Sequence, residues 1–291
     1  MGEIVAAALL GHVPTVMLPE ETRVKLGGGV DTTMVDGFAR VRERLDRAAA
    51  DTLVIFDTHW FTTTEHVVAG AEHHAGVYTS EELPMVIRDL AYDYAGAPAL
   101  GALVRDVGKE RGVRTLNATN PHIAHHYPTL NLVHHLHRGE QVLSVGICQT
   151  ASRDDFTEFG AVLAEAIRRS DARVALLASG GMSHRFWPLS EILDHQVYDA
   201  SHVITPEARA FDERILALWR DGAHAEVIDL YADYQAHSPE GYFGHYLMLV
   251  GALRGRACRA PGEQLSAYEN SVGTGQVHVW FELPRAAEVA A

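Results

Sequence analysis

Histidine is the residue type in this chain with the greatest capacity for chemistry. The 291 residues include 18 histidines, and imidazole is both the commonest metal ligand in proteins and the usual acid or base near neutral pH. His12, His59 and His184 each come shortly after an apolar run that predicts a buried strand. The prediction of the fold and of the site therefore starts from the placement of these three histidines.

Two of these histidines suit a metal site. Two imidazoles and one carboxylate on one face of a divalent ion leave adjacent positions open for a substrate and dioxygen, as in non-haem Fe(II) oxygenases. His12 and His59 are candidates for the two imidazoles. Zinc accepts the same ligands with a bound water, so a zinc hydrolase is an alternative. Lone histidines are also common in loops and cores, and the residue types alone do not decide between these interpretations.

An alternation of apolar strands and amphipathic helices must position these histidines. The pattern predicts strands at 4–10, 52–56, 141–149, 174–178 and 276–281, and helices at 32–50, 82–94, 98–111, 129–137, 154–169, 206–221, 223–232 and 241–253. We expect one large α/β domain over residues 1–291, with a central mixed, mostly parallel sheet flanked by helices on both faces. Ligands bind beyond the carboxyl ends of the strands in such sheets, so His12, His59 and His184 are expected to converge.

Composition excludes several classes of partner. The formal charge is 24 − 38 = −14 and no cluster of Lys or Arg stands out, so we expect neither nucleic acid nor a membrane surface as a partner. Cys148 and Cys258 are far apart and form no CxxC motif, which favours a reducing compartment. No apolar run approaches about 18 residues, and the N-terminus lacks a signal-peptide pattern. We expect a cytoplasmic protein that forms a homo-oligomer.

Five sequence runs, spread over nearly the whole chain, form a specific combination although no single run is specific. They are residues 11–14 (GHVP), 56–60 (FDTHW), 76–84 (GVYTSEELP), 178–186 (ASGGMSHRF) and 273–277 (GTGQV). Together they resemble the class III extradiol ring-cleavage dioxygenases, and most closely the branch that cleaves homoprotocatechuate (3,4-dihydroxyphenylacetate). The resemblance implies an enzyme that inserts both atoms of O2 into a catechol ring next to the diol and gives a ring-opened semialdehyde.

The resemblance also implies roles for particular residues. The Fe(II) ligands of the family fall on His12, His59 and Glu240, and its acid/base histidine falls on His184. The stretch 235–239 before Glu240 departs from the usual pattern of the branch, so His237 and Asp233 are alternative ligands.

The substrate contacts implied by the resemblance lie in two other segments. Related enzymes carry a second active-site histidine in the loop that corresponds to residues 122–126, so one of His122, His125 and His126 is expected to face the substrate and meet its carboxylate. Tyr78 and Thr79 are expected to line the pocket. The density of histidine in this loop is unusual for the branch, which leaves an aminophenol or a differently substituted catechol, including a specialised metabolite, as alternative substrates.

Two further interpretations follow from the remaining histidines. A binding relative that has lost its metal is the alternative to an enzyme, and the retention of His12, His59 and His184 counts against it. The pairs at residues 73–74 and 134–135 are expected to be solvated or on a helix surface.

Overall fold

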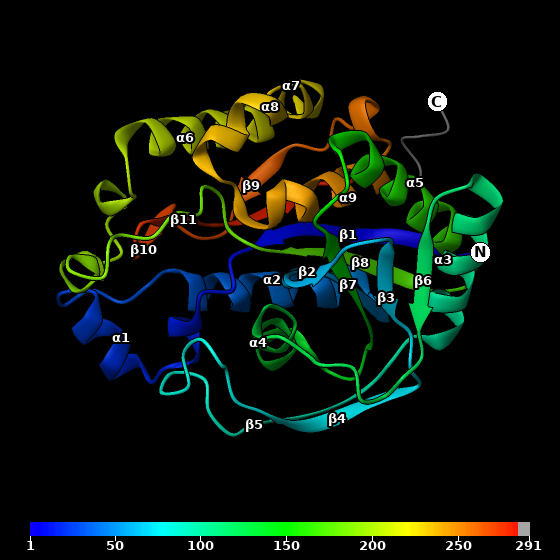
Figure 1. The fold of residues 1–291 in the computed structure, drawn as a ribbon, viewed down its shortest axis with the longest axis horizontal. Helices are drawn as coiled ribbons and strands as arrows, with labels where there is room; N and C mark the ends of the chain where they lie inside the picture. The colour runs from blue at the N-terminus through cyan, green and yellow to red at the C-terminus, as the bar shows by residue number, and fades with distance from the viewer. Residues whose placement is uncertain (285–291) are drawn as a thin grey trace.

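An eight-stranded mixed sheet forms the centre of the computed structural model, which describes residues 1–284 (Figure 1). The strand order is β6-β3-β7-β2-β8-β1-β12-β9. The central strands β7, β2, β8 and β1 are parallel, whereas β12, near one edge, pairs antiparallel with both of its neighbours, β1 and β9. The strands are β1 (Glu3–Leu10), β2 (Thr52–Thr62), β3 (His66–Ala69), β6 (Thr115–Ala118), β7 (Gln141–Cys148), β8 (Arg173–Ser179), β9 (Gly262–Gln264) and β12 (His278–Phe281). The mixed, mostly parallel sheet expected from the sequence is confirmed.

Helices cover both faces of this sheet (Figure 1). On one face lie α2 (Met34–Ala48) and α4 (Tyr127–Leu136); on the other lie α3 (Pro98–Arg111), α5 (Arg153–Arg169), α6 (Pro206–Arg220), α7 (His224–Asp229), α8 (Tyr231–Tyr234) and α9 (Gly244–Ala252). Successive side chains of a strand point to opposite faces, so Ala7 and Leu9 of β1 pack into one apolar core while Ala8 and Leu10 pack into the other. Both faces are therefore buried, which accounts for the continuously apolar strands.

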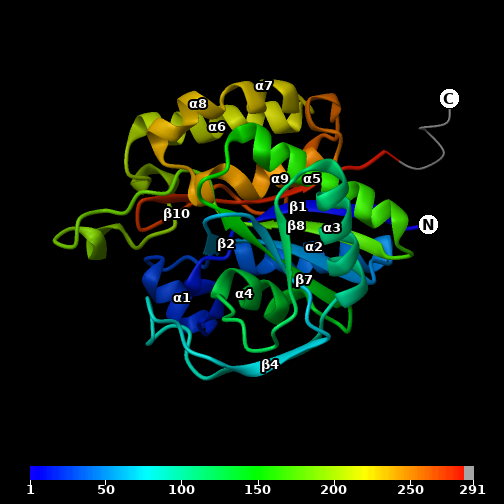
Figure 2. The same cartoon turned by 45° about the vertical axis from the view of Figure 1, so that its right-hand side comes forward.

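Shorter elements connect these layers. They are α1 (Glu20–Leu26), a hairpin of β4 (His73–Tyr78) and β5 (Leu90–Ala95), a hairpin of β10 (Glu269–Ser271) and β11 (Thr274–Gln276), and 3-10 turns at Pro14–Met17, Ile192–His195, Ala200–His202, Gln235–His237, Glu240–Phe243 and Gly255–Ala257. Figures 1 and 2 both place the β4–β5 hairpin beyond α4, on the side of α4 away from the sheet.

The expected helix at 82–94 is wrong. The segment forms a turn and then strand β5, whose side chains alternate between more and less buried positions from Leu90 to Ala95. Its apolar residues also recur at helical spacing, but Pro84 removes a backbone donor and Asp89 takes a left-handed φ of 53°. Both features disfavour a continuous helix, and pairing with β4 supplies the backbone hydrogen bonds instead.

Smaller differences concern element ends and the histidine pairs. The second strand continues to Thr62, the helix expected from 241 begins at Gly244, and the helix expected at 223–232 is divided into α7 and α8. The chain also forms strands β3, β6 and β9, which are too short to give a clear sequence pattern. His74 is buried rather than solvated and His135 is half-buried. Within residues 1–284, no helix combines the length and apolar character needed to cross a membrane.

Candidate active site

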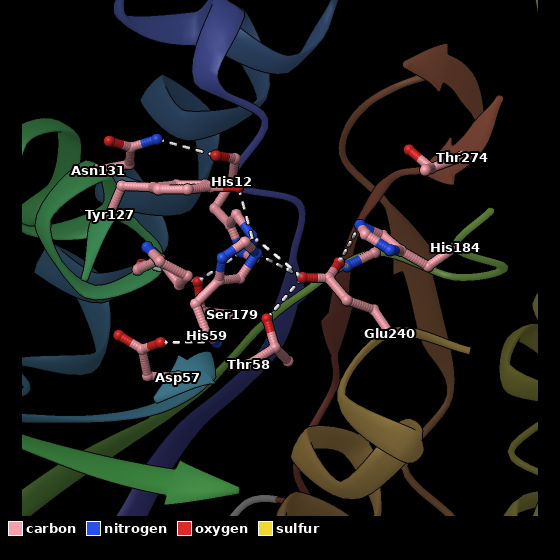
Figure 3. Close-up of polar contacts among 12 residues, drawn as sticks. His12, Asp57, Thr58, His59, Tyr127, Asn131, Ser179, His184, Glu240 and Thr274 are labelled. Atoms are coloured by element: carbon pink, nitrogen blue, oxygen red, sulfur yellow. Dashed lines mark hydrogen bonds and ion pairs between the residues drawn. The ribbon is translucent and has the colours of Figure 1, made fainter. Parts of the chain in front are cut away.

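His12, His59, His184 and Glu240 converge at the carboxyl edge of the parallel strands (Figure 3). His12 comes two residues after the end of β1, and His184 lies in the loop after β8. His12 and Glu240 are buried, whereas about a quarter of each of the His59 and His184 side chains is exposed. Segments far apart in the sequence thus bring three imidazoles and one carboxylate to a single site.

An interruption in β2 positions His59. Asp57 pairs with Gly146 of β7 but the next paired residue of β2 is Phe61, so the residues between them have no partner on β7. The Asp57 carboxylate supports this bulge by accepting hydrogen bonds from the backbone N–H groups of His59 and Trp60, at 2.9 and 3.0 Å. Its other oxygen accepts from the Thr129 hydroxyl at 2.6 Å, which ties the bulge to α4. His59 therefore lies within an irregular strand rather than beyond the end of one.

Glu240 begins a strained turn. Its N–H donates to the Met182 carbonyl at 3.0 Å, and the next three residues, Gly241, Tyr242 and Phe243, take left-handed φ values of 53°, 57° and 61°. The Thr58 hydroxyl donates to Glu240 Oε1 at 2.6 Å, and the Gly181 N–H donates to Oε2. Such backbone strain persists where surrounding contacts determine the conformation, and it gathers at functional sites.

The three candidate ligands offer a suitable donor set for a divalent ion. The ligand atoms of His12, His59 and Glu240 all lie within 4.8 Å of one another. Glu240 Oε1 lies 3.1 Å from His12 Nε2 and 3.5 Å from His59 Nε2. Two imidazoles and a carboxylate that face one another suit Fe(II) and also zinc. His237, the alternative ligand, packs its ring against Phe211 instead, at a centroid distance of 5.0 Å.

The surroundings of His12 set its tautomer. His12 Nδ1 lies 3.1 Å from Ser179 Oγ, and the Ser179 hydroxyl itself donates to the Pro128 carbonyl at 2.8 Å. Because the serine proton is used in that bond, Nδ1–H of His12 donates to Ser179 and Nε2 keeps its lone pair for a metal. Asn131 of α4 fixes the backbone by donating to the His12 carbonyl at 2.8 Å.

His184 is placed as an acid or base beside the ligands rather than as one of them. Its Nε2 lies 3.9 Å from Glu240 Oε2. Its backbone N–H donates to the Ser238 carbonyl at 3.1 Å. Burial lowers the pKa of His184 below its ordinary value, although the Glu240 charge acts in the opposite direction. Burial would also raise the pKa of Glu240, but the imidazoles of His12 and His184 hold that pKa well below its ordinary value. The site thus holds an ionised carboxylate beside an imidazole that is neutral near pH 7.

Tyr127 is a candidate site residue that the sequence interpretation did not name. It is the first residue of α4, and its hydroxyl lies beside His59 (Figure 3), 3.2 Å from His59 Nε2. The same hydroxyl lies 3.2 Å from Glu82 Oε2. Burial, followed by the charge of Glu82, raises the pKa of Tyr127, so the hydroxyl keeps its proton and is a donor. The only sequence signal was its position directly after His126.

A cavity of about 390 Å³ opens beside these residues, and His12, Tyr127, His184 and Glu240 form part of its wall. This volume lies within the range of small-molecule sites, roughly 300–1,000 Å³. The remaining wall comes from the segments after β1, before β5 and after His184, and from the β10–β11 hairpin. The cavity gives a small molecule direct access to the candidate metal ligands.

The expected substrate contacts lie away from this cavity in the described part of the chain. His122 is exposed, His126 is half-buried, and neither lines the cavity. His125 is buried between Tyr94 and His74, to which its ring nitrogens lie at 3.2 and 3.1 Å.

Tyr78 and Thr79, which were also expected to contact the substrate, lie away from the cavity. Tyr78 packs into the core beneath the β4–β5 hairpin and Thr79 is exposed, and the wall of the cavity includes neither residue. Instead, this part of the chain contributes Glu82, Leu83 and Val86 to the cavity.

The fold and the site define a class: an α/β enzyme with two histidines and one carboxylate as candidate metal ligands and a neighbouring histidine base. Residues 6–282 match the protein family described as the catalytic LigB subunit of aromatic ring-opening dioxygenase. The chain belongs to this family and is an extradiol, ring-cleaving dioxygenase. The resemblance seen in the sequence is confirmed, and ring opening rather than hydrolysis is the reaction of the family.

Individual relatives agree with this assignment. The chain is 33% identical to the 3,4-dihydroxyphenylacetate 2,3-dioxygenase of Escherichia coli over 261 residues, which cover 87% of this chain and 91% of that protein. It is 24% identical over 301 residues to the 2-aminophenol 1,6-dioxygenase beta subunit of a Pseudomonas species, covering 98% and 96%. The crystal structure of an uncharacterized Escherichia coli protein has the same fold, with a TM-score of 0.61, 17% identity and coverage of 94% and 98%.

Proposed function

We propose that this protein uses Fe(II), held by His12, His59 and Glu240, to open a catechol ring next to its diol and form a semialdehyde. The observation that supports the proposal most directly is the approach of the three ligand atoms to within 4.8 Å, beside His184 and a cavity. When bound there, the iron would neutralise the charge of the catecholate and bring the ring and O2 together.

His184 transfers protons in the proposed reaction. A catechol must lose a proton to bind through both oxygens, and a neutral imidazole at the cavity wall can accept that proton. The same residue, once protonated, can return the proton as the ring opens. The lowered pKa of His184 keeps the base form populated near neutral pH.

Tyr127 and Glu82 have a positioning role in this proposal. The Tyr127 hydroxyl lies beside His59 and donates its one proton to Glu82, so it can limit the movement of the imidazole, and its oxygen can accept a hydrogen bond from a group in the cavity. Thr58 and Gly181 hold the Glu240 carboxylate, which leaves few orientations open to it.

Anaerobic loading with Fe(II) or Zn(II), followed by a substrate panel, tests the proposal. We expect about one iron per chain, O2 uptake with catechols and a yellow ring-opened product, whereas the zinc-loaded protein should consume no O2. The panel includes 2-aminophenol, the substrate that one relative is named for. Bound iron without O2 uptake on any of these rings would refute the proposal.

The 3,4-dihydroxyphenylacetate substrate expected from the sequence is also the one that another relative is named for, and we retain a substituted catechol as the substrate class. Cytoplasmic location and a homo-oligomeric state remain predictions. Light scattering coupled to gel filtration tests the oligomeric state.

A further inference from the structure

We propose that the substrate of this enzyme is a catechol whose ring substituent is uncharged and apolar, because the described residues give the cavity beside the metal ligands aliphatic walls and neither Lys nor Arg. This inference rests on the proposed function and narrows its substrate class. It favours an alkyl or similar substituent over the carboxylate of dihydroxyphenylacetate.

The wall of the cavity away from the metal ligands is largely apolar. Aliphatic side chains reach it from three separate segments, the chain after β1, the turn before β5 and the segment after β8: Leu18, Leu26, Leu83, Val86, Ile192 and Leu193. Apart from Glu82, the polar residues of this part of the wall are neutral: Thr15, Gln196 and Tyr198, and Ser271, Thr274 and Gln276 on the β10–β11 hairpin. A substituent that extends from the ring therefore meets mostly hydrocarbon.

None of the cavity-lining residues in the described part of the chain is Lys or Arg. Arg23, on α1, uses its guanidinium in a two-point bond to Asp31, at 2.9 and 2.7 Å. Arg185, next in sequence to His184, is exposed and outside the wall. The loop containing His122, His125 and His126 is also outside it, so residues 1–284 do not supply the cavity wall with the cation expected for a carboxylated substrate.

The charge at the cavity wall has the wrong sign for an anion. Glu82 lies there, half-exposed, with its carboxylate 3.9 Å from His59 Nδ1 and 3.2 Å from the Tyr127 hydroxyl. The net charge of the chain, −14, adds to the repulsion at longer range. A carboxylate that leaves water without a partner pays a large desolvation cost, and like charges across a binding site reduce affinity further.

Packing against the same wall favours the binding of an apolar substituent. Phe186 and Leu193 line the cavity yet remain 49% and 74% exposed, and Leu83 remains 37% exposed. A substituent packed against them would remove both its own surface and theirs from water. Each buried methylene is worth about 0.8 kcal/mol, which is about a fourfold change in affinity.

The test compares matched rings on the Fe(II)-loaded enzyme. Across catechol, 4-methylcatechol, 4-ethylcatechol and 4-propylcatechol, kcat/KM should rise by about three- to fourfold per carbon. The kcat/KM for methyl 3,4-dihydroxyphenylacetate, which is neutral, should exceed the kcat/KM for the free acid at least tenfold. Anaerobic calorimetry should show the same order in Kd, which separates binding from turnover. A free acid that equals or exceeds its ester in both measurements would overturn the inference.

A pair of variants at Gln196 supplies a matched control. Gln196 lines the cavity, is half-buried, and has no part in the proposed chemistry. Gln196→Arg should raise the ratio of kcat/KM for the acid to that for the ester at least tenfold, whereas the similarly long Gln196→Met should not. Equal effects of the two substitutions would show that charge at this wall does not select the substituent.

Failure of the proposed function gives a different result from failure of this inference. If no ring is opened and no catechol binds to the iron-loaded protein, the proposed function fails and the inference falls with it. If catechol itself is opened but the carboxylated ring is preferred, the proposed function stands and only the apolar substrate class is refuted.

Discussion

The Glu240 carboxylate faces the other residues of the candidate site. Oε1 accepts from Thr58 and faces the Nε2 atoms of His12 and His59, while Oε2 accepts from Gly181 and faces His184. A divalent ion between the carboxylate and the imidazole lone pairs of His12 and His59 would satisfy all three ligands at once.

The proposed site should lose its iron when any one of the three candidate ligands is removed. We expect His12→Ala, His59→Ala and Glu240→Ala each to lose bound iron and activity together, because two remaining protein ligands hold Fe(II) poorly. The folded state should survive, as judged by circular dichroism, and iron is measured after anaerobic loading. If Glu240→Ala kept stoichiometric iron and normal turnover, Glu240 would not be the ligand, and His237 and Asp233 would have to be tested.

Replacement of His184 should separate metal binding from proton transfer. His184→Asn and His184→Phe are expected to keep iron but to slow turnover by about 10²- to 10⁴-fold, the usual loss for a positioned acid or base. The readout that distinguishes this role from a structural one is the pH profile of kcat, whose limb assigned to the base should vanish. A parent-like profile in His184→Asn would rule out His184 as the proton carrier.

At the scale of elements, the sequence predicts the strands that carry the site better than the loops that shape it. The apolar runs before His12 and His184 predict β1 and β8, and both histidines follow those strands as expected. The β2 bulge that presents His59 depends on Asp57 accepting bonds from the chain around it and from α4, a long-range pairing without a local signal. Strand β5 lies in the segment expected to form a helix, because apolar residues there also recur at helical spacing.

The turn at Glu240 is another part of the site that the local sequence does not predict. The family resemblance marked the residue, but the local sequence did not predict three successive left-handed residues after it. Only the packed structure, with Thr58 against this turn, makes that conformation favourable. Substrate contacts were the least predictable part, because which loop faces the cavity depends on how the hairpin and α4 pack.

The turn after Glu240 can be tested with two glycines of similar backbone conformation. Gly241 has a φ of 53° and an added Cβ would lie 2.8 Å from Thr58 Cγ2, whereas Gly255 has a φ of 57° and open space around it. Gly255→Ala should cost about 1–2 kcal/mol of stability, from the left-handed backbone alone, and leave iron binding unchanged. Gly241→Ala should cost more and weaken iron binding at least tenfold, because it displaces the hydroxyl that holds Glu240. Equal iron affinity in the two variants would contradict this account.

At the scale of the whole molecule, many histidines serve the fold rather than the site. Burial lowers the pKa of His66, His125 and His135 to about 4 and that of His278 to about 3. An unfolded chain binds a proton at each of these residues near pH 6.5, whereas the folded chain does not until the pH is much lower. Stability should therefore fall as the pH drops from about 6.5 to 4. The abundance of histidine makes this acid sensitivity a property of the entire fold.

His66 allows the effect to be measured one residue at a time. Its ring stacks on Phe159 at a centroid distance of 4.4 Å, and its Nδ1 has no hydrogen-bond partner within residues 1–284. His66→Phe should therefore keep the packing and leave the free energy of unfolding at pH 7 nearly unchanged. Because the folded pKa of about 4 lies below the unfolded value of 6.5, the parent loses stability that the variant keeps, about 2 kcal/mol by pH 5.

Urea unfolding of the iron-free proteins at pH 7, 6 and 5 measures this difference. His122→Asn is the control, because that side chain is exposed and its replacement should give no gain that grows as the pH falls. If the His66→Phe protein and the parent lost stability in parallel between pH 7 and 5, the ring of His66 would be protonated as easily in the folded chain as in the unfolded one. Burial in the α5 side of the core would then not be what keeps it neutral.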